Sequence, residues 1–306
     1  MEIEEVFARF RELKYGIRAK KKSESIWFGE HRSAFKGSGY DIIGVDQWKD
    51  GQPLKDIAWS LSLRTYPHKI YKIERMEPKE MRTILVADLS YSMLFRILHD
   101  ANKALLLLDL IGSIGLTRAH LRDSVGLLGF SDRIELYLRP KLGTAQVFHM
   151  AQKIFEKAQF EREYPTKRKA DLSVPLEFLS SRLRLRHSIV LISDLVDLLN
   201  GRDIIDFKLL GRLASKHDMI MLILDDPEEF IVKRKLGYVR AANMETGEQI
   251  VFSARRAGAI RRDIEESRAV LMADLKRLAS IDSVVLTPEN YFAVLTTFLM
   301  ARVGRR

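Results

Sequence analysis

The chain has 306 residues, and 46% of them are apolar, which is enough for one large α/β domain or for a domain with an attachment. It contains no cysteine, so disulfides, thiol nucleophiles and cysteine-ligated zinc or iron–sulfur sites are excluded. The formal net charge of +10 favours an acidic partner surface, a nucleic acid or an anionic membrane face. No apolar run is long enough to span a membrane, and the N-terminus lacks the pattern of a secretory signal, so we expect a cytoplasmic protein.

The first 80 residues differ in pattern from the rest of the chain. An amphipathic helix is predicted from about Ile3 to Lys22, where it ends in three lysines. The stretch from Ser23 to Asp56 is rich in glycine and tryptophan and predicts irregular loops and short strands held by large side chains. Alternating apolar residues from Lys69 to Met76 predict a strand. We therefore expect residues 1–80 to form an N-terminal helix and an irregular block with short β-strands.

From about Met81, buried apolar strands alternate with helices, which is typical of a parallel sheet covered on both faces. The predicted strands are Thr83–Asp88, Ser124–Phe130, Arg133–Leu138, Ser188–Asp194, Met219–Leu224 and Ser283–Leu286. The predicted helices are Ile97–His120, Thr144–Ala158, Val174–Arg184, Ile204–Lys216, Ala254–Ala279 and Pro288–Arg302. Because only a short link precedes the third strand, we expect it to be an antiparallel edge. Residues 81–306 are thus predicted to form a doubly wound, mostly parallel, Rossmann-like α/β domain, with a β-hairpin inserted near residues 236–253.

The segment Asp88-Leu89-Ser90-Tyr91-Ser92 is the most informative motif of the chain. It follows a buried apolar strand, and in an extended segment alternate residues point the same way. The carboxylate of Asp88 and the hydroxyls of Ser90 and Ser92 would then converge as oxygen ligands of the kind that Mg²⁺ prefers. The alternative is a polar turn between a strand and a helix, with Ser92 near the helix N-cap.

A second carboxylate is expected at the same edge of the sheet. Asp194 ends another buried apolar strand, which we expect to lie beside the strand that ends at Asp88. Ligands of open parallel sheets bind outside the carboxyl ends of the strands, where the strand order reverses. The pattern therefore predicts a metal site with two carboxylates and two hydroxyls, although each aspartate alone would also serve to cap the following turn.

These motifs resemble the metal-ion-dependent adhesion site of von Willebrand factor A domains. Upstream segments resemble the N-terminal block of the domain of unknown function 58 family, namely His31-Arg32-Ser33, Gly37-Ser38-Gly39, Asp50-Gly51, Ile57-Ala58-Trp59 and Leu63-Arg64-Thr65. The resemblance covers nearly the whole chain and implies a von Willebrand A-like domain that binds Mg²⁺ or another divalent cation. It also implies a MoxR-type AAA+ ATPase as partner, because such ATPases are usually encoded beside members of the family. At the cation, it implies capture of an acidic side chain from a client or partner protein.

The chain departs from the family pattern at positions that bear on the site. An adhesion site expects a threonine on a middle loop, where this chain has Ala170. Asp171, Ser173 or Thr166 would have to substitute, or water would, and we take Asp171 as the candidate ligand. In the upstream block, Gly51-Gln52-Pro53 stands where the family commonly has acidic residues. The site is therefore either completed by a substitute ligand or degenerate and without metal.

We expect a non-enzymatic adaptor that works with a MoxR-type ATPase, either presenting client proteins for remodelling or helping to insert a cofactor or metal into them. No activated nucleophile, general base or GxxxxGK[ST] phosphate-binding loop is evident in the sequence. A metal-dependent hydrolase would need a general base near the cation, for which Asp171 and Asp197 are the candidates.

The alternative function is binding of nucleic acid or another anionic surface by a protein with a degenerate metal site. It rests on the charge of +10 and on basic residues near the N-terminus, with aromatic residues beside them for stacking. The cluster consists of Lys20, Lys21, Lys22, Arg32 and Lys36, with Trp27 and Phe28 nearby, and a second patch contains Arg182, Arg184 and Arg186. Nucleic acid is the less favoured partner, because no arginine-rich tail or RNA-recognition signature accompanies these residues.

Overall fold

The computed structural model covers the whole chain and divides it into two compact units. The larger unit comprises Met1–Trp27 and Met81–Arg306, and the smaller unit comprises Phe28–Glu80. The residues that the structure describes are 3–19, 36–37, 41–65, 69–76, 81–94, 102–166, 168–195, 205–226, 238–242, 249–253 and 257–303.

A six-stranded sheet is the centre of the larger unit, with the strand order β11-β8-β7-β4-β5-β6. Its strands are β4 (Arg82–Asp88), β5 (Ser124–Phe130), β6 (Ile134–Lys141), β7 (Ser188–Ser193), β8 (Asp218–Leu224) and β11 (Asp282–Leu286). Neighbouring strands pair in parallel except β5 and β6, which pair antiparallel. The mostly parallel α/β fold and the antiparallel edge strand are therefore confirmed.

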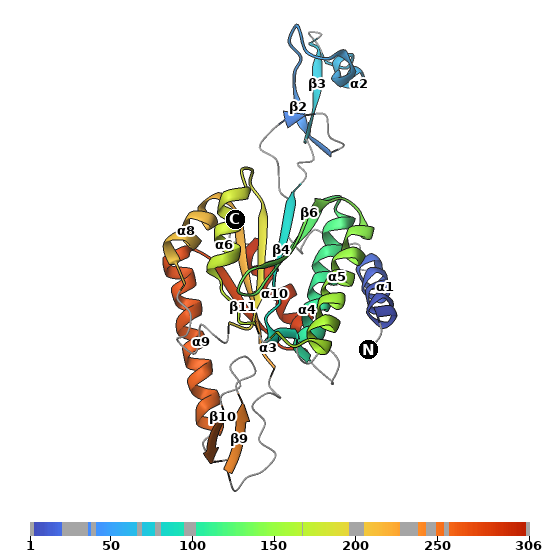
Figure 1. Cartoon of the computed structure of the whole chain (residues 1–306). Helices are drawn as coiled ribbons and strands as arrows, with labels where there is room; N and C mark the ends of the chain where they lie inside the picture. Colours follow the sequence, from blue (N-terminus) through green and yellow to red (C-terminus); the bar gives the residue numbers. More distant parts are fainter. Residues whose placement is uncertain are drawn as a thin grey trace. The chain divides into compact units, whose positions relative to one another are not determined.

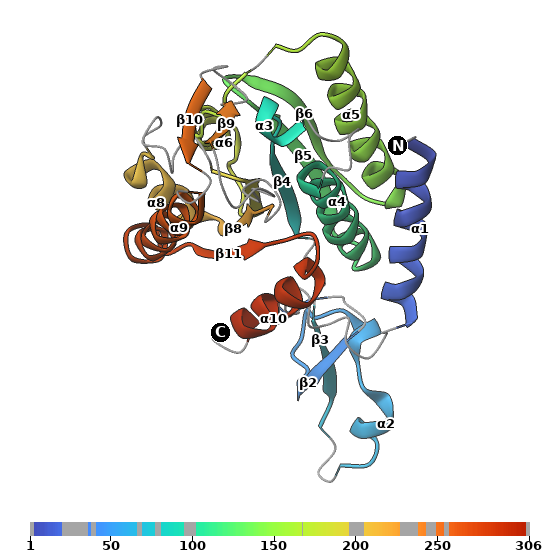
Figure 2. The same ribbon diagram turned by 90° about the horizontal axis from the view of Figure 1, so that it is seen from below.

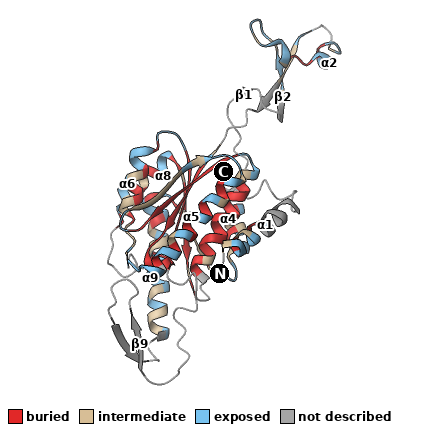
Figure 3. Cartoon of the chain, turned by 45° about the vertical axis from the view of Figure 1, so that its right-hand side comes forward, coloured by how far each residue is buried: buried red, intermediate tan, exposed pale blue. Residues whose placement is uncertain are grey.

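Helices cover both faces of this sheet (Figures 1 and 2). The helices of the larger unit are α1 (Ile3–Ala19), α3 (Tyr91–Leu94), α4 (Asn102–His120), α5 (Thr144–Glu163), α6 (Ser173–Arg182), α8 (Phe207–Lys216), α9 (Ala257–Ala279) and α10 (Tyr291–Val303). On one side, Ile84 and Val86 of β4 belong to a buried cluster with Leu176 of α6, Leu213 of α8 and Leu275 of α9. Helices α4 and α5 lie on the other side. Strands β4, β5 and β7 are consequently buried along nearly their whole length (Figure 3), as continuous apolar runs require.

Helix α1 packs against α4 and α5 and belongs to the larger unit. The ring of Phe10 lies against Gly112, where a Cβ on residue 112 would clash with the ring. Arg9 forms an ion pair with Asp109. The N-terminal block therefore begins after α1, at Phe28, whereas we expected residues 1–80 to form one region.

The smaller unit contains a three-stranded antiparallel sheet in the order β1-β3-β2. Its elements are β1 (Lys36–Gly37), β2 (Asp41–Gln47), the 3-10 helix η2 (Leu54–Asp56), α2 (Trp59–Ser62) and β3 (Tyr71–Met76). The N–H of Ala58 donates to the carbonyl of Tyr71 at 2.7 Å, which holds α2 against β3. The predicted strand near Lys69–Met76 is thus confirmed.

The predicted hairpin is present as β9 (Tyr238–Ala242) and β10 (Gln249–Ser253), which pair antiparallel. Helix α10 begins three residues later than predicted, at Tyr291, because the N–H groups of Asn290 and Tyr291 first close a turn on the carbonyl of Thr287. Among the described helices, none combines the length and the apolar character needed to cross a bilayer.

Candidate functional site

Two adjacent parallel strands place Asp88 and Asp194 at the same edge of the sheet. β4 ends at Asp88, and it pairs with β7 so that Ala87 lies opposite Ile192. Asp194 follows β7 directly. The chain continues from β4 to β5 on one side and later returns to β7 on the other, so the strand order reverses at β4. The predicted adjacency of the two strand ends is confirmed.

The DxSxS segment brings its two hydroxyls together through a helical turn, and the expected extended conformation is wrong. β4 ends at Asp88, and α3 already begins at Tyr91. The carbonyl of Ser90 accepts a hydrogen bond from the N–H of Met93 at 3.1 Å, which closes the first turn. The Oγ atoms of Ser90 and Ser92 nevertheless lie 3.1 Å apart. Two neutral oxygen donors therefore converge, as predicted, but the turn produces the convergence.

Asp88 is completely buried, and each of its carboxylate oxygens accepts a hydrogen bond. The N–H of Ser90 donates to Oδ1 at 2.8 Å, and the hydroxyl of Ser193 donates to Oδ2 at 2.6 Å. Burial raises the pKa of Asp88 to about 7; the negative charge of Asp194 adds to the rise, while the hydrogen bonds from Ser193 and Ser90 oppose it. Two carboxylates thus lie close together in a buried volume, where a positive charge stabilises both.

A buried lysine that we did not predict lies at the same site. Lys103, in the first turn of α4, is 5% exposed, and its Nζ lies 3.1 Å from Oδ2 of Asp194. Lysine is seldom buried without a partner, so a lysine near the start of a helix is usually predicted to be exposed to solvent. The apolar run Ala104–Leu108 that follows was the available signal, because it requires this part of the helix to be surrounded by protein.

The middle loop, where an adhesion site expects a threonine, makes mainly structural contacts. Ala170 packs against the buried apolar cluster on that face of the sheet. The hydroxyl of Thr166 donates to the carboxylate of Glu161 at 2.7 Å. The carboxylate of Asp171 accepts the N–H and the hydroxyl of Ser173, at 2.9 and 2.6 Å, and so caps the start of α6. None of the described hydrogen bonds joins Asp171 to the other predicted ligands.

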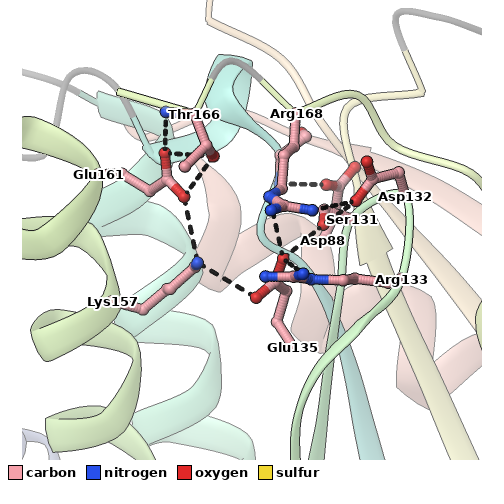
Figure 4. Close-up of polar contacts among 10 residues, drawn as sticks. Asp88, Ser131, Asp132, Arg133, Glu135, Lys157, Glu161, Thr166 and Arg168 are labelled. Atoms are coloured by element: carbon pink, nitrogen blue, oxygen red, sulfur yellow. Dashed lines mark hydrogen bonds and ion pairs between the residues drawn. The ribbon is translucent and has the colours of Figure 1, made fainter. Parts of the chain in front are cut away.

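An ion network fixes this loop against the sheet (Figure 4). At its centre is Glu135 of β6, whose Oε1 accepts the hydroxyl of Ser131 at 2.9 Å and lies 3.1 Å from Nε of Arg133. Lys157 and Arg168 lie 3.2 and 3.5 Å from the same carboxylate. Burial alone would raise the pKa of Glu135, but the hydrogen bonds from Arg133, Ser131 and Lys157 lower it overall.

The network reaches the DxSxS turn through Arg168. The guanidinium of Arg168 binds Asp132 at 2.9 Å, and the carbonyl of Arg168 accepts the N–H of Tyr91 at 3.0 Å. Tyr91 lies between Ser90 and Ser92 in the chain. The network therefore fixes the turn that presents the two hydroxyls.

The donor set fits a hard divalent cation such as Mg²⁺, which takes oxygen ligands. The adjacent hydroxyls of Ser90 and Ser92 would bind it directly, and Asp88 and Asp194 would hold it directly or through water. Lys103 binds one oxygen of Asp194, so an ammonium group of the chain already contacts one of the candidate ligands. Some of the predicted residues lie outside the described part of the chain. They are the candidate base Asp197 and the basic residues Lys20–Lys22 and Arg32, with the aromatic residues Trp27 and Phe28.

Comparison with protein families supplies the classification. A family model described as "Protein of unknown function DUF58" matches residues 45–273. The chain belongs to the DUF58 family. The match includes the DxSxS segment, Asp194 and much of the upstream block, so the family resemblance seen in the sequence is confirmed at this level.

Two solved structures are similar to this DUF58 chain at low identity. BatB, a conserved hypothetical protein from Bacteroides thetaiotaomicron, is 11% identical, and the match covers 74% of this chain and 100% of that chain with a TM-score of 0.37. An aerotolerance-related membrane protein from Bacteroides fragilis NCTC 9343, carrying multiple mutations to serines, is 12% identical with the same coverage and a TM-score of 0.39. Similarity at this level gives no information about the site. None of the curated proteins matches the chain significantly.

Proposed function

We propose that this DUF58 protein binds a hard divalent cation such as Mg²⁺ at Asp88, Ser90, Ser92 and Asp194, and uses it to capture an acidic side chain of a partner protein. The observation that carries the proposal is the 3.1 Å approach of the Ser90 and Ser92 hydroxyls beside the buried carboxylate of Asp88. Hydroxyl ligands are neutral, so they leave the charge of a cation less compensated than carboxylate ligands would. The cation therefore keeps an attraction for a carboxylate from outside.

The ligand set of the proposal differs from the sequence-based one at one position. Asp171 is left out, because its carboxylate caps α6 through both the N–H and the hydroxyl of Ser173. Ala170 offers no side-chain oxygen. Water, or the carboxylate of the partner, therefore completes the coordination on the side of the middle loop.

The captured partner gives the protein the role of a non-enzymatic adaptor for a MoxR-type AAA+ ATPase, in client remodelling or in cofactor or metal insertion. The ATPase rests on the family resemblance alone. The adaptor role, and a von Willebrand A-like classification of the domain, are supported by the position of the site at the carboxyl edge, where the strand order reverses at β4.

The cation is tested by titrating Mg²⁺ into chelator-treated full-length protein in a calorimeter. We expect saturable binding that Asp88→Ala abolishes and Ser92→Ala weakens. Asp274→Ala is the control, because Asp274 pairs with Arg277 on α9 and is not part of the network that holds the DxSxS turn. Absence of binding at millimolar Mg²⁺, or binding that survives in Asp88→Ala, would overturn the proposal.

The partner is tested by retention of a recombinant MoxR-type ATPase on the immobilised protein. Retention should require Mg²⁺, should be lost with chelator, and should be lost in Asp88→Ala but kept in Asp274→Ala. A column that stays empty with and without Mg²⁺ would remove the ATPase from the proposal. Retention that ignores chelator but falls steeply with salt would instead favour the basic surface as the binding region.

A further inference from the structure

The amino edge of the six-stranded sheet carries exposed basic side chains on five adjacent strands. Strands β8, β7, β4 and β5 begin at this edge, and the antiparallel strand β6 ends there, because Lys141 pairs with Val125 near the start of β5. Neighbouring strands lie about 4.8 Å apart, so these strand ends form a row roughly 20 Å long. We define the basic edge by the exposed residues Arg82, Arg122, Lys141, Arg184, Arg186 and Lys216 of this row.

The positive charge of the basic edge is not neutralised by neighbouring acids. Among the described residues, none of the six basic side chains forms an ion pair. The acidic residues at the same strand ends are bound by other arginines. Asp123 is bound by Arg118. Asp218 and Asp282 are both bound by Arg302. The described loops of this edge expose positive charges and no acidic side chain, so the edge attracts an anionic surface.

Exposed leucines lie among these positive charges. Leu121, Leu142 and Leu185 are 42, 59 and 57% exposed. Each of them is next in the chain to at least one residue of the basic edge. They come from three loops, which lie before β5, after β6 and before β7. The edge therefore presents apolar side chains and positive charges from the same loops.

We propose that the basic edge binds the surface of a membrane that contains anionic lipids. The arginines and lysines contact the lipid phosphates, and the three leucines enter the boundary between the headgroups and the acyl chains. A nucleic acid fits this surface less well, because proteins that bind single strands stack the bases on aromatic side chains. Among the described residues of these loops, no phenylalanine, tyrosine or tryptophan is exposed.

This inference is independent of the proposed function. Asp88 lies at the carboxyl end of β4, and Arg82 lies at the amino end of the same strand. A strand of seven residues is roughly 20 Å long, so the two surfaces lie on opposite edges of the sheet. A larger unit bound through the basic edge therefore turns its candidate cation site away from the lipid.

The membrane is tested by sedimenting the full-length protein with vesicles in the presence of a chelator. Vesicles of phosphatidylcholine alone are compared with vesicles of an equimolar mixture of phosphatidylcholine and phosphatidylglycerol. We expect the protein to sediment with the mixed vesicles at low ionic strength, to be released as salt is added, and to stay in solution with phosphatidylcholine alone. A protein that stays in solution with the mixed vesicles at low ionic strength would overturn the inference.

A pair of double variants tests whether the basic edge makes the contact. Arg184→Gln with Arg186→Gln is compared with Lys208→Gln with Arg262→Gln, which removes the same charge from exposed residues at the far ends of α8 and α9. We expect the affinity for mixed vesicles to fall at least about tenfold in the edge variant and less than about twofold in the control. Equal affinities of the two variants would show binding by net charge alone and would overturn the inference.

Replacement of the leucines tests whether lipid is the partner. The triple variant Leu121→Ser, Leu142→Ser and Leu185→Ser should bind mixed vesicles at least about tenfold more weakly, because it loses the insertion of three apolar side chains. Val270→Ser is the control, since Val270 is 62% exposed on α9. These side chains are exposed, so an unchanged urea midpoint will show that the variants are folded. If the triple variant bound as wild type does, or if wild type bound a DNA duplex but no vesicles, the edge would belong to another anionic partner and the membrane assignment would be wrong.

Discussion

The amino and carboxyl edges of the larger sheet both bury charged side chains, but they compensate the charges differently. At the amino edge, NH1 of Arg118 lies 2.8 Å from Oδ2 of Asp123, and Arg118 is 1% exposed. At the carboxyl edge, Asp88 and Asp194 are both buried, and Nζ of Lys103 lies 3.1 Å from Oδ2 of Asp194. The amino edge thus buries a pair of opposite charges, whereas the carboxyl edge buries two carboxylates at adjacent strand ends, one of them bound to a lysine.

The difference separates a structural cluster from a binding site. A buried pair of opposite charges is complete within the folded chain, and removing one member leaves the other buried and unpaired. Burial and the charge of Asp194 raise the pKa of Asp88, so a proton or an added cation would stabilise these two neighbouring carboxylates. Variants that remove a buried charge at the amino edge should therefore lose stability, whereas such variants at the carboxyl edge should lose cation binding.

The largest effect is expected for Arg118→Met at the amino edge. The substitution leaves Asp123 without the guanidinium and should lower the free energy of unfolding by about 3–5 kcal/mol. Urea denaturation with and without Mg²⁺ measures the loss, which should not depend on the cation. Arg82→Met is the control, because Arg82 is exposed at the start of β4 and its replacement should change stability by less than about 0.5 kcal/mol. A loss below about 1 kcal/mol for Arg118→Met would contradict a structural role for this pair.

A smaller effect on stability is expected from a change of pH, through His217 at the same amino edge. Burial lowers the pKa of His217 from 6.5 to about 4, and the charges of His187, Lys216 and Arg186 add to the decrease. The unfolded chain binds this proton more readily than the folded protein, so the stabilising contribution is present above pH 6.5 and is lost as pH falls toward 4. Asn at position 217 keeps an acceptor for the N–H of His187 but does not titrate.

His217→Asn should therefore remove about 1–2 kcal/mol of the stability difference between pH 7 and pH 5. Urea midpoints at the two pH values measure this difference. His120→Asn is the control, because His120 is exposed. If the wild type and His217→Asn lost the same stability on acidification, His217 would not carry this pH dependence.

Much of the fold was predictable because apolar runs of strand length determine it locally. The strand ending at Asp88 and the strand ending before Asp194 each appear as a continuous buried run. Their adjacency follows from the general rule that parallel sheets wind outward in both directions from a central strand. Side chains at their carboxyl ends were therefore predictable as neighbours.

The residues that the sequence did not reveal depend on contacts between distant segments or on local turn geometry. Lys103 lies 91 positions before Asp194 in the chain, and no local pattern links the two. The segment after Asp88 does not continue as a strand, because the carbonyl of Ser90 accepts the first hydrogen bond of the short helix α3. Asp171 was predicted as a ligand from its position in the middle loop, but its hydrogen bonds to Ser173 depend on where α6 begins.

The smallest effect on stability is expected for Asp88→Asn at the carboxyl edge. In chelator-treated protein at pH 7.5, the amide can still accept the N–H of Ser90, and the substitution removes repulsion from Asp194. The free energy of unfolding should therefore change by no more than about 1 kcal/mol and is expected to rise. Asp123→Asn is the matched variant at the amino edge, and it should lose several times more because Arg118 would keep its charge without the carboxylate.

The two isosteric variants sharpen the contrast between the edges, because each neutralises one buried carboxylate without creating a cavity. If Asp88→Asn lost more than about 2 kcal/mol, the carboxylate would stabilise the fold as Asp123 does, and its burial would no longer indicate a ligand. If it kept its stability but lost the Mg²⁺ isotherm, the burial of Asp88 would be explained by cation binding. The buried carboxylate of Asp88 would then contribute to binding the cation rather than to the stability of the fold.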